Sequence, residues 1–268
     1  MSRPRFLRQL RAAARQIRAV APVRIRDGVG ANLRMDLRHA SAWYGHGTNE
    51  MPIQLALAAH IHPGDVFYDI GANVGFFTLI AARLVGPKGR VIAFEPVAAN
   101  AAAIRRNVAL NHFTNISVVE AAIADREGEG ELLVTDHGGG AALASVAAAP
   151  SARPSPAVVP AATTTIDALI ARGEIPPPSM VKIDVEGAER EVLRGMSETM
   201  RSLHPKIVCE VDDASSERLE PRLRDVQGML ESAGYRVERL DPAYPHLAWA
   251  VAHLLALPAP AVTPAPAP

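Results

Sequence analysis

The stretch VFYDIGANVGFFTLIAARL, residues 66 to 84, decides the fold of this chain. An apolar run leads into Gly-Ala-Asn-Val-Gly, and a second apolar run follows without a spacer. A short apolar run that ends in glycine is typical of a buried strand, and the run from Phe76 has the length of a helix. Asp69 stands just before the first glycine. The stretch therefore predicts a strand, a tight turn and a helix, with a carboxylate at the turn that points to a bound ligand.

Strands and helices alternate from residue 66 onward. Strands are predicted at 66–70, 90–96, 116–124, 128–135, 179–185, 205–211, 235–240 and 247–255. Helices are predicted at 76–85, 97–111 and 187–196, with a further helix that begins near Pro221 and stops at Gly234. Several strands are apolar on both faces, which is typical of parallel strands between two helical layers. The predicted fold class is α/β, a Rossmann-like, mostly parallel sheet with helices on both faces.

Composition divides the chain into three segments. Residues 1–45 contain a basic helix and a small hairpin at 23–37, residues 46–257 form the α/β domain, and residues 258–268 are a Pro/Ala tail expected to be disordered. The domain is predicted to start with a helix at 47–62. A Pro/Ala-rich insertion near 147–162 has a composition unsuited to a sheet ladder, so we expect a flexible loop there.

The charge of the chain is balanced overall but not locally. Lys plus Arg and Asp plus Glu both number 28, so no basic excess favours nucleic acid as a partner. Residues 1–26, in contrast, carry eight arginines and no acid, with apolar residues at near-helical spacing. This segment is interpreted as an amphipathic helix packed on the domain. The alternative is a helix within residues 1–20 that makes a peripheral contact with an anionic membrane.

Two further observations bear on where the protein works. Cys209 is the only cysteine and lies in an apolar, strand-like run, so no internal disulfide can form and a buried, inert thiol is expected. No apolar run reaches the ~18 residues that a membrane span requires. The sequence predicts a cytoplasmic protein, peripheral to the membrane if the basic helix binds lipid, and leaves the oligomeric state open.

The turn at residues 69–75 has the features of a cofactor site. Gly71 and Gly75 allow the backbone to turn sharply and a ligand to approach closely. The helix that follows presents unpaired N–H groups toward the turn. Glu95 ends the second strand 24 residues after Gly71, where a carboxylate can accept both hydroxyls of a ribose. Asp69 can accept a hydrogen bond from a positively charged group of the same ligand.

This turn departs from the dinucleotide fingerprint Gly-x-Gly-x-x-Gly. Asn73 replaces the second glycine, and Phe76 stands in place of the third. A pyrophosphate needs the close backbone approach of the second glycine, and Asp69 would repel it. S-adenosylmethionine carries a ribose and a cation but no phosphate, so it fits better. An NAD-dependent dehydrogenase is the less favoured alternative.

A second group of charged residues lies in VKIDVEGAEREVLRGM, residues 181 to 196. Strand periodicity places Lys182 and Asp184 on one face, and a lysine in a buried strand requires such a partner. Glu210 is expected to end the next strand and to lie beside them. Glu186 and Glu189 flank the start of the following helix, where the helix dipole favours anions. The group is either a structural ion-pair network or a catalytic centre with tuned pKa values.

These segments resemble the FkbM family of S-adenosylmethionine-dependent methyltransferases. The resemblance rests on DIGANVG at 69–75 together with KIDVEGAE at 182–189, and it covers about residues 45–240. It implies the class I methyltransferase fold, S-adenosylmethionine as cofactor, and O-methylation of a hydroxyl on a sugar, polyketide or related small-molecule or glycan acceptor. The residues that it implies at the cofactor are Asp69, Gly71, Asn73, Gly75 and Glu95, with Asp125 of AAIAD near the adenine.

A methyltransferase of this kind needs a proton acceptor, because a hydroxyl is a poor nucleophile until its proton is removed. Asp184 or Glu210 is expected to act as the base, and Lys182 to set their charge state. Glu186 could hold a substrate hydroxyl. A metal is possible because three carboxylates converge, but no metal ligand is assigned, because no histidine joins these carboxylates at ligand spacing. The histidines are interpreted as solvated or capping residues. The remaining alternative, an inactive methyltransferase-like adaptor at a membrane surface, is disfavoured because the charged residues of both sites are retained.

Overall fold

The computed structural model describes residues 22–38, 40–134, 141–143, 157–213, 215–244 and 250–260. The basic helix expected within residues 1–20, together with its membrane contact, lies outside the described residues. So do residues 147–156 of the Pro/Ala-rich segment and residues 261–268 of the expected tail. The described residues comprise the α/β domain and the hairpin that precedes it.

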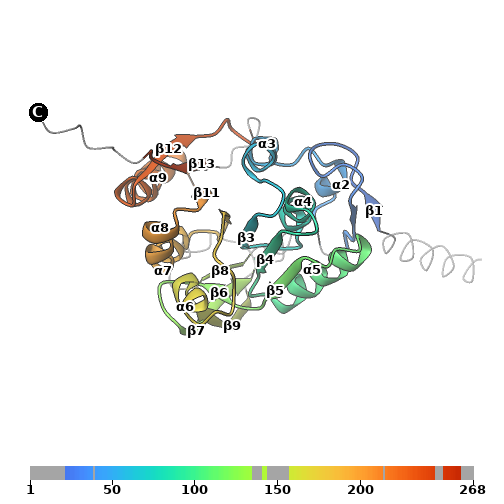
Figure 1. Ribbon diagram of the computed structural model, residues 1–268, viewed down its shortest axis with the longest axis horizontal. Coiled ribbons are helices and arrows are strands. Elements are labelled where there is room, and N and C mark those ends of the chain that lie inside the picture. Colours follow the sequence, from blue (N-terminus) through green and yellow to red (C-terminus); the bar gives the residue numbers. More distant parts are fainter. Residues whose placement is uncertain are drawn as a thin grey trace, which may run out of the picture.

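A seven-stranded sheet forms the centre of the molecule (Figure 1). Its order is β12 (Tyr235–Arg239), β13 (Ala250–Pro258), β11 (Lys206–Asp213), β10 (Met180–Ile183), β3 (Val66–Ile70), β4 (Arg90–Phe94) and β5 (Ile116–Val119). The strands from β11 to β5 are parallel, and β13 runs antiparallel to both β11 and β12. Parallel neighbours require crossover connections, which the helices between them supply.

Helices cover both faces of this sheet, as the apolar strands predict. One face packs against α3 (Met51–His60), α4 (Phe76–Val85) and α5 (Ala98–Leu110), and the other against α6 (Ile166–Ala171), α7 (Glu189–Gly195), α8 (Ser197–Leu203) and α9 (Ser216–Ser232). Phe67 and Met180 lie in the cluster under α3 and α4, whereas Tyr68 and Val181 lie in the cluster under α6 to α9. The predicted fold class is therefore confirmed.

Strand order reverses at β3. The chain runs from β3 outward through β4 to β5, and it then returns to place β10 on the opposite side of β3 and β11 beyond it. On sheets of this kind, ligands bind at such a reversal, at the carboxyl ends of the strands. There Asp69 pairs with Lys182, and Ile70 pairs with Ile183. The turn at 71–75 and the charged segment after Ile183 therefore lie side by side.

A second, four-stranded sheet contains part of the Pro/Ala-rich segment. Its order is β6 (Ala122–Ile123), β9 (Ala157–Thr164), β7 (Gly128–Val134) and β8 (Ala141–Leu143). The prediction that residues 147–162 cannot join a sheet is wrong for residues 157–162, which pair antiparallel with β7. A proline has no N–H to donate, so it is tolerated where one edge of its strand has no partner. Pro160 is at such a place, because β6 pairs with β9 solely at residues 163 and 164.

Smaller differences concern the ends of elements. The segment 116–124, predicted as one strand, is divided into β5 and β6, which belong to different sheets. α9 begins at Ser216 rather than near Pro221, so the proline removes one hydrogen bond from inside the helix. Gly234 follows α9 at a φ of 90°, as expected for a helix stop. The predicted hairpin is present as β1 (Val23–Arg24) and β2 (Arg34–Met35), followed by α2 (Trp43–His46).

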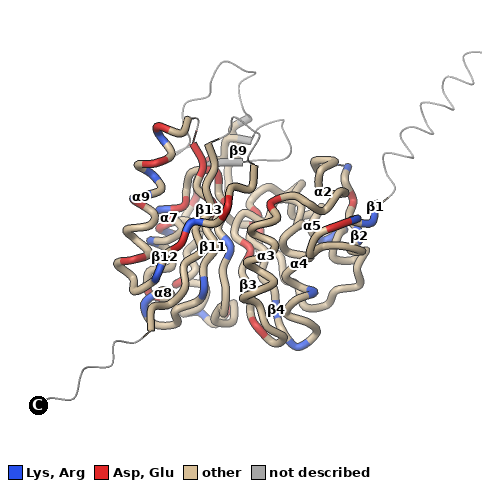
Figure 2. The backbone as a smooth tube through the Cα atoms, turned by 90° about the horizontal axis from the view of Figure 1, so that it is seen from above, with Lys and Arg blue, Asp and Glu red and all other residues tan. Residues whose placement is uncertain are grey.

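Charged residues of both signs are interspersed over the described surface. Figure 2 shows Lys and Arg next to Asp and Glu along α9 and the strands beside it. Ion pairs such as Arg190–Asp225 and Arg239–Glu220 join them.

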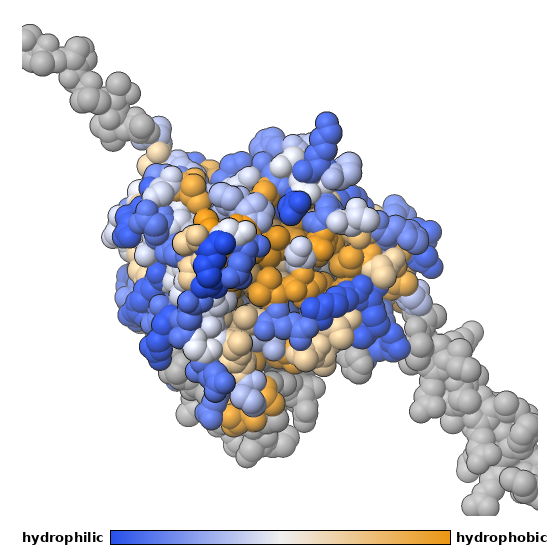
Figure 3. All heavy atoms as spheres, turned by 60° about the horizontal axis from the view of Figure 1, so that its bottom comes forward, coloured by the Kyte–Doolittle hydropathy of each residue, from blue (hydrophilic) through white to orange (hydrophobic). Residues whose placement is uncertain are grey.

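On the face shown in Figure 3, hydrophobic residues gather in a band between hydrophilic flanks. None of the described helices combines the length and the apolar character needed to cross a membrane.

Candidate active site

Strand register brings four ionisable side chains to one face of the sheet. Asp69 of β3 pairs with Lys182 of β10, and Glu210 of β11 pairs with His253 of β13. Each is two residues from a strand residue in the core cluster under α3 and α4, so all four point toward that helical layer. Asp69, Lys182 and His253 are at most 2% exposed. A row of ionisable groups thus crosses a part of the sheet that is otherwise apolar.

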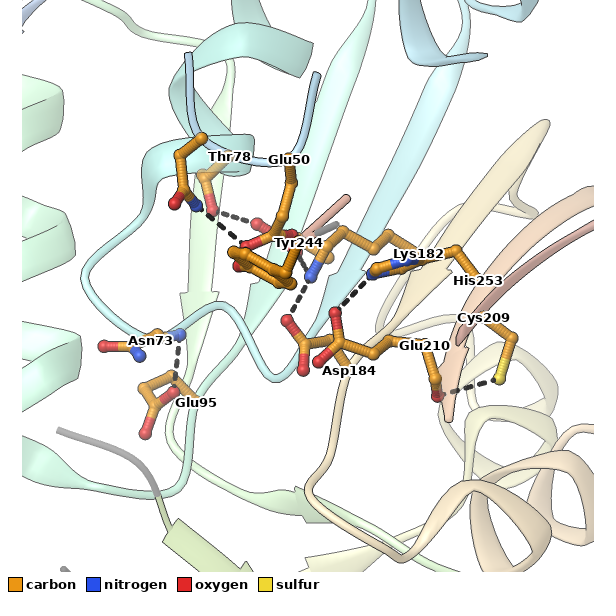
Figure 4. A network of polar contacts seen from close by, with 12 residues as sticks. Glu50, Asn73, Thr78, Glu95, Lys182, Asp184, Cys209, Glu210, Tyr244 and His253 are labelled. Carbon is orange, nitrogen blue, oxygen red and sulfur yellow. Dashed lines mark hydrogen bonds and ion pairs between the residues drawn. The ribbon is translucent and has the colours of Figure 1, made fainter. Parts of the chain in front are cut away.

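Lys182 is the positive charge of this row. Its Nζ donates to Asp184 Oδ2 at 2.7 Å, lies 4.0 Å from Asp69 Oδ1, and is 4.7 Å from the centre of the Phe77 ring (Figure 4). Burial alone would lower the pKa of Lys182, but the charges of the surrounding carboxylates, first that of Asp184, outweigh burial and raise this pKa. Lys182 is therefore permanently charged, and the predicted Lys182–Asp184 pair is present.

Asp69 is held inside the protein. Thr78 Oγ1 donates to Asp69 Oδ2 at 2.5 Å, whereas Asp69 Oδ1 is buried and accepts no hydrogen bond from the residues that the structure describes. Burial raises the pKa of Asp69, although the charge of Lys182 opposes the rise. A buried polar group without a hydrogen bond costs about 1–3 kcal/mol. Asp69 Oδ1 is therefore available to accept a hydrogen bond from a ligand. The positive charge next to Asp69 within the protein is Lys182.

The two glycines of the turn are required by the chain itself. Gly71 has a φ of 80°, and a Cβ there would lie 1.7 Å from the carbonyl oxygen of Asp184. The close approach that Gly71 permits is therefore that of the segment after β10 rather than that of a ligand. Gly75, at a φ of 89°, immediately precedes α4, and its Cβ would lie 3.2 Å from Ile104 Cγ1. These glycines shape the turn and set Asp184 beside it.

Glu95 follows β4 and ties the turn to α5. Its carboxylate accepts from the backbone N–H groups of Asn73 at 2.7 Å and Val97 at 2.9 Å, and from Asn100 Nδ2 at 3.3 Å. Burial raises the pKa of Glu95 to about 7, and these donors limit the rise. Asn73 has a φ of 51°, and its Oδ1 is buried without a hydrogen-bond partner in the described part of the chain. The Glu95 carboxylate and Asn73 Oδ1 are thus two acceptors that could serve a ligand.

His253 of this row and its neighbours Tyr244 and Glu50 were not singled out by the sequence analysis. His253 Nε2 and Glu210 Oε2 lie 2.6 Å apart, and Tyr244 donates its hydroxyl to Glu50 Oε1 at 2.6 Å (Figure 4). One donor atom each of Glu50, Glu210 and His253 lies within 4.8 Å of the others. Burial raises the pKa of Glu210 and lowers that of His253 to about 4. His253 is therefore neutral at neutral pH.

These contacts correct three predictions. His253 is neither solvated nor capping, because it is 2% exposed within the apolar strand β13. A histidine does join the carboxylates, because β13 pairs antiparallel with β11 and brings His253 to Glu210 across 43 residues of sequence. Glu210 does not end its strand, since β11 continues to Asp213. The sequence did offer one signal for a buried site at His253, which is a lone histidine in an apolar run. No sequence pattern indicated that Glu50 would join the site.

Glu186 and Asp125 occupy different places relative to this row. Glu186 lies in the segment after β10 at a φ of 51°. Burial, followed by the charge of Asp184, raises the pKa of Glu186 to about 8. Asp125 is exposed just after β6, and its ion pair is with Arg126 at 3.6 Å. Glu186 is therefore next to the charged row, and no described contact brings Asp125 to it.

Glu189, at the start of α7, makes structural contacts. It accepts from the backbone N–H of Gly187 and pairs with Arg222 Nη2, both at 2.7 Å. Arg222 also donates to the carbonyl oxygen of Gly187 at 2.9 Å. These contacts join α7 to α9, and they favour the structural interpretation of Glu189.

Comparison with known sequences supplies the identification. The profile of the FkbM methyltransferase domain matches residues 69–237. The chain belongs to the FkbM methyltransferase family. The matched region begins at Asp69 and includes both the turn and the charged segment after β10, so the predicted family is confirmed. The protein is an S-adenosylmethionine-dependent methyltransferase, and the dehydrogenase and inactive-adaptor alternatives are set aside.

Named relatives of this FkbM family methyltransferase are moderately similar to it. The 31-O-demethyl-FK506 methyltransferase FkbM of Streptomyces tacrolimicus is 29% identical over 209 residues, which cover 69% of this chain and 78% of that protein. The hexuronic acid methyltransferase AglP of Haloferax volcanii is 31% identical over 152 residues, which cover 54% of this chain and 55% of that protein. The crystal structure of a methyltransferase FkbM from Methylobacillus flagellatus superposes with a TM-score of 0.49 and 16% identity, over 81% of this chain and 55% of that one.

S-adenosylmethionine is the cofactor of this family member, and the residues at the strand-order reversal fit it. The oxygens Asp69 Oδ1 and Asn73 Oδ1 are buried at the turn and receive no hydrogen bond from any described residue. The Glu95 carboxylate follows the neighbouring strand β4, where it could accept ribose hydroxyls. These acceptors match a ligand that carries hydroxyl and ammonium donors.

The pKa of Glu95 predicts how cofactor affinity changes with pH. Ribose hydroxyls would donate to the ionised Glu95 carboxylate, and at a pKa of about 7 that form falls from about nine-tenths at pH 8 to about one-tenth at pH 6. The affinity for S-adenosylhomocysteine is therefore expected to fall about tenfold from pH 8 to pH 6. Calorimetry in two buffers of different ionisation enthalpy should show the release of close to one proton on binding at pH 6. A flat affinity without proton release would contradict this assignment of Glu95.

Proposed function

We propose that this methyltransferase transfers the methyl group to a hydroxyl oxygen of a sugar, polyketide or related small-molecule or glycan acceptor. The names of two relatives, a 31-O-demethyl-FK506 methyltransferase and a hexuronic acid methyltransferase, support this acceptor class. The observation that carries the proposal is a partly exposed carboxylate, Asp184, ion-paired to Lys182 at the strand-order reversal. When bound, S-adenosylmethionine supplies a methyl group activated by its sulfonium, so the protein must supply alignment and a proton acceptor.

Asp184 is the proton acceptor that we assign. Its side chain is 25% exposed, and its Oδ2 is engaged by Lys182, so Oδ1 is the oxygen assigned to the acceptor hydroxyl. A carboxylate within hydrogen-bond reach of a hydroxyl can take its proton as the new bond forms. The carbonyl oxygen of Asp184 packs against Gly71, and this contact holds the base next to the cofactor turn.

Glu210 is the less favoured base. Its side chain is 14% exposed, it is paired with His253, and burial raises its pKa, so its ionised form is disfavoured. Glu186 has a different assigned role. With a pKa of about 8, its carboxyl group is largely protonated at neutral pH and can both donate and accept a hydrogen bond. It is therefore suited to hold a second hydroxyl of the acceptor.

We assign the cofactor to the turn at 69–75 and to Glu95. Asp69 and Asn73 would receive donors of the ligand at their unsatisfied oxygens, and Glu95 would receive the ribose hydroxyls. Gly71 and Gly75 contribute through the shape of the turn. Asp125 is assigned to the adenine on the family resemblance alone.

The proposal is tested with methyl-labelled S-adenosylmethionine and a panel of acceptors, each paired with an analogue that lacks one hydroxyl. The panel contains simple pyranosides, a hexuronic acid glycoside and a macrolide-type polyketide. We expect label in a methyl ether that survives mild alkali, and no label in the matching deoxy analogue. An alkali-labile methyl ester, transfer to an amine or thiol instead, or transfer to none of the hydroxyl acceptors would count against the proposal.

A further inference from the structure

We propose that Glu50, Glu210 and His253 form a binding site for one divalent transition-metal cation such as Mn²⁺. The three residues come from separate elements, since Glu50 precedes α3, Glu210 is in β11 and His253 is in β13. One donor atom of each lies within 4.8 Å of the others. Donors bound at about 2.1 Å to a single ion are at most ~4.2 Å apart, so side-chain movements of less than ~1 Å would complete the set.

An unsatisfied oxygen of Glu50 is the independent sign of a cation. Glu50 is 7% exposed, and its Oε1 accepts from Asn49 Nδ2 at 2.8 Å and from the Tyr244 hydroxyl at 2.6 Å. Its Oε2 is buried and has no hydrogen-bond partner among the described residues. The two oxygens of one carboxylate are adjacent, so Oε2 belongs to the same cluster. A metal ion would satisfy an oxygen that is otherwise unfavourable to bury.

The charges around the cluster also favour a cation. The charges of Asp184, Asp69 and Glu50 act on Lys182, and those of Asp184, Glu50 and Lys182 act on Glu210. Four carboxylates against one ammonium leave three negative charges when all are ionised. Buried charges are stable only when they are paired or coordinate a metal. A divalent cation would neutralise most of this excess without the loss of any carboxylate.

The donor set selects the kind of metal. Two carboxylates and one imidazole suit first-row transition metals, whereas Mg²⁺ and Ca²⁺ prefer oxygen ligands alone. The Tyr244 hydroxyl donates a hydrogen bond to Oε1 of Glu50, as outer partners of metal ligands do. The charge of Asp184, the proposed proton acceptor, acts on Glu210, so the metal site lies next to that acceptor. A metal there could bind the acceptor hydroxyl and lower its pKa, a role that rests on the proposed function although the binding itself does not.

The test is Mn²⁺ binding to the full-length protein, treated with a chelator that is then removed, and followed by electron paramagnetic resonance without cofactor or acceptor. We expect one Mn²⁺ per chain and, in spin-echo spectra, nitrogen modulation from an imidazole ligand. Binding to His253→Ala and to Glu50→Gln should be at least ~10-fold weaker. His62→Ala is the matched control. His62 is exposed and pairs with Asp65 at 3.7 Å, and neither residue belongs to the cluster, so Mn²⁺ binding should equal that of the unmodified protein.

Three results would overturn the site. They are no Mn²⁺ binding by the unmodified protein, bound Mn²⁺ without nitrogen modulation, and equal binding by the His253 and His62 variants. Melting temperatures identify a variant that fails to fold, and the spin-echo measurement on the unmodified protein then decides alone. No methyl transfer is measured, so a failed metal site leaves the proposed function intact, and a failed methyl transfer leaves the metal site intact.

Discussion

Glu95→Ala is expected to weaken the binding of S-adenosylhomocysteine by roughly 30- to 1000-fold while the fold persists. The variant loses a charged acceptor for the ribose hydroxyls, which is worth on the order of 2–4 kcal/mol. It also releases the backbone N–H groups of Asn73 and Val97, so the turn loses the contact that ties it to α5. Isothermal titration calorimetry measures the loss, and thermal unfolding reports whether the fold is retained.

Glu120→Ala is the matched control for this change. Glu120 follows β5 as Glu95 follows β4, but its side chain is 42% exposed and pairs with Arg105. Its removal should leave the affinity within about twofold, because exposed ion pairs contribute about 0–1 kcal/mol to stability and Glu120 lies outside the assigned site. Equal affinities in the two variants would show that Glu95 does not hold the cofactor.

Asp184→Asn is expected to lower turnover by about 100-fold or more and to leave the affinity for S-adenosylhomocysteine within a few-fold. Asparagine keeps the shape of the side chain but cannot take the proton of a hydroxyl, and general-base catalysis contributes about 10²–10⁴-fold. Turnover is measured with an acceptor from the hydroxyl panel and labelled S-adenosylmethionine, and affinity is measured by calorimetry.

Two comparisons make the Asp184 result specific. Asp225→Asn removes an exposed carboxylate that pairs with Arg190, and its turnover should match that of the unmodified enzyme. Glu210→Gln tests the other candidate base, and if it alone removes activity, the base is Glu210. If cofactor binding collapses together with turnover in Asp184→Asn, then Asp184 belongs to the cofactor site or to the fold.

The parallel core could be predicted because its signals are local. The stretch 66–84 contains the apolar run, the turn and the helix within a single βα unit, and β3 and α4 form at the expected residues. The turn around Gly71 follows from chain geometry that glycine alone adopts easily, at a φ of 80°. The Lys182–Asp184 pair was predictable for the same reason, since two residues of one strand segment share a face.

The Pro/Ala-rich segment shows where local composition misleads. Prolines near 147–162 argue against a ladder, yet β9 uses residues 157–164. Whether Pro160 can lie in a strand depends on whether one edge of that strand is left without a partner. The positions of β6 and β7 on the two sides of β9 decide this. A single sequence does not contain this information.

The sequence by itself determined the α/β class, the family, the turn at 69–75 and the charged segment after β10. Only the tertiary structure decided which groups meet around that segment. Glu210 reaches His253 because β13 is antiparallel to β11, with a register that places these two residues opposite each other across 43 positions of sequence. Glu50 reaches them from the segment before α3, on the helical layer over the same face. Such long-range pairings depend on ladder register and on the packing of a whole layer, whereas sequence patterns report only the few residues along one strand or helix.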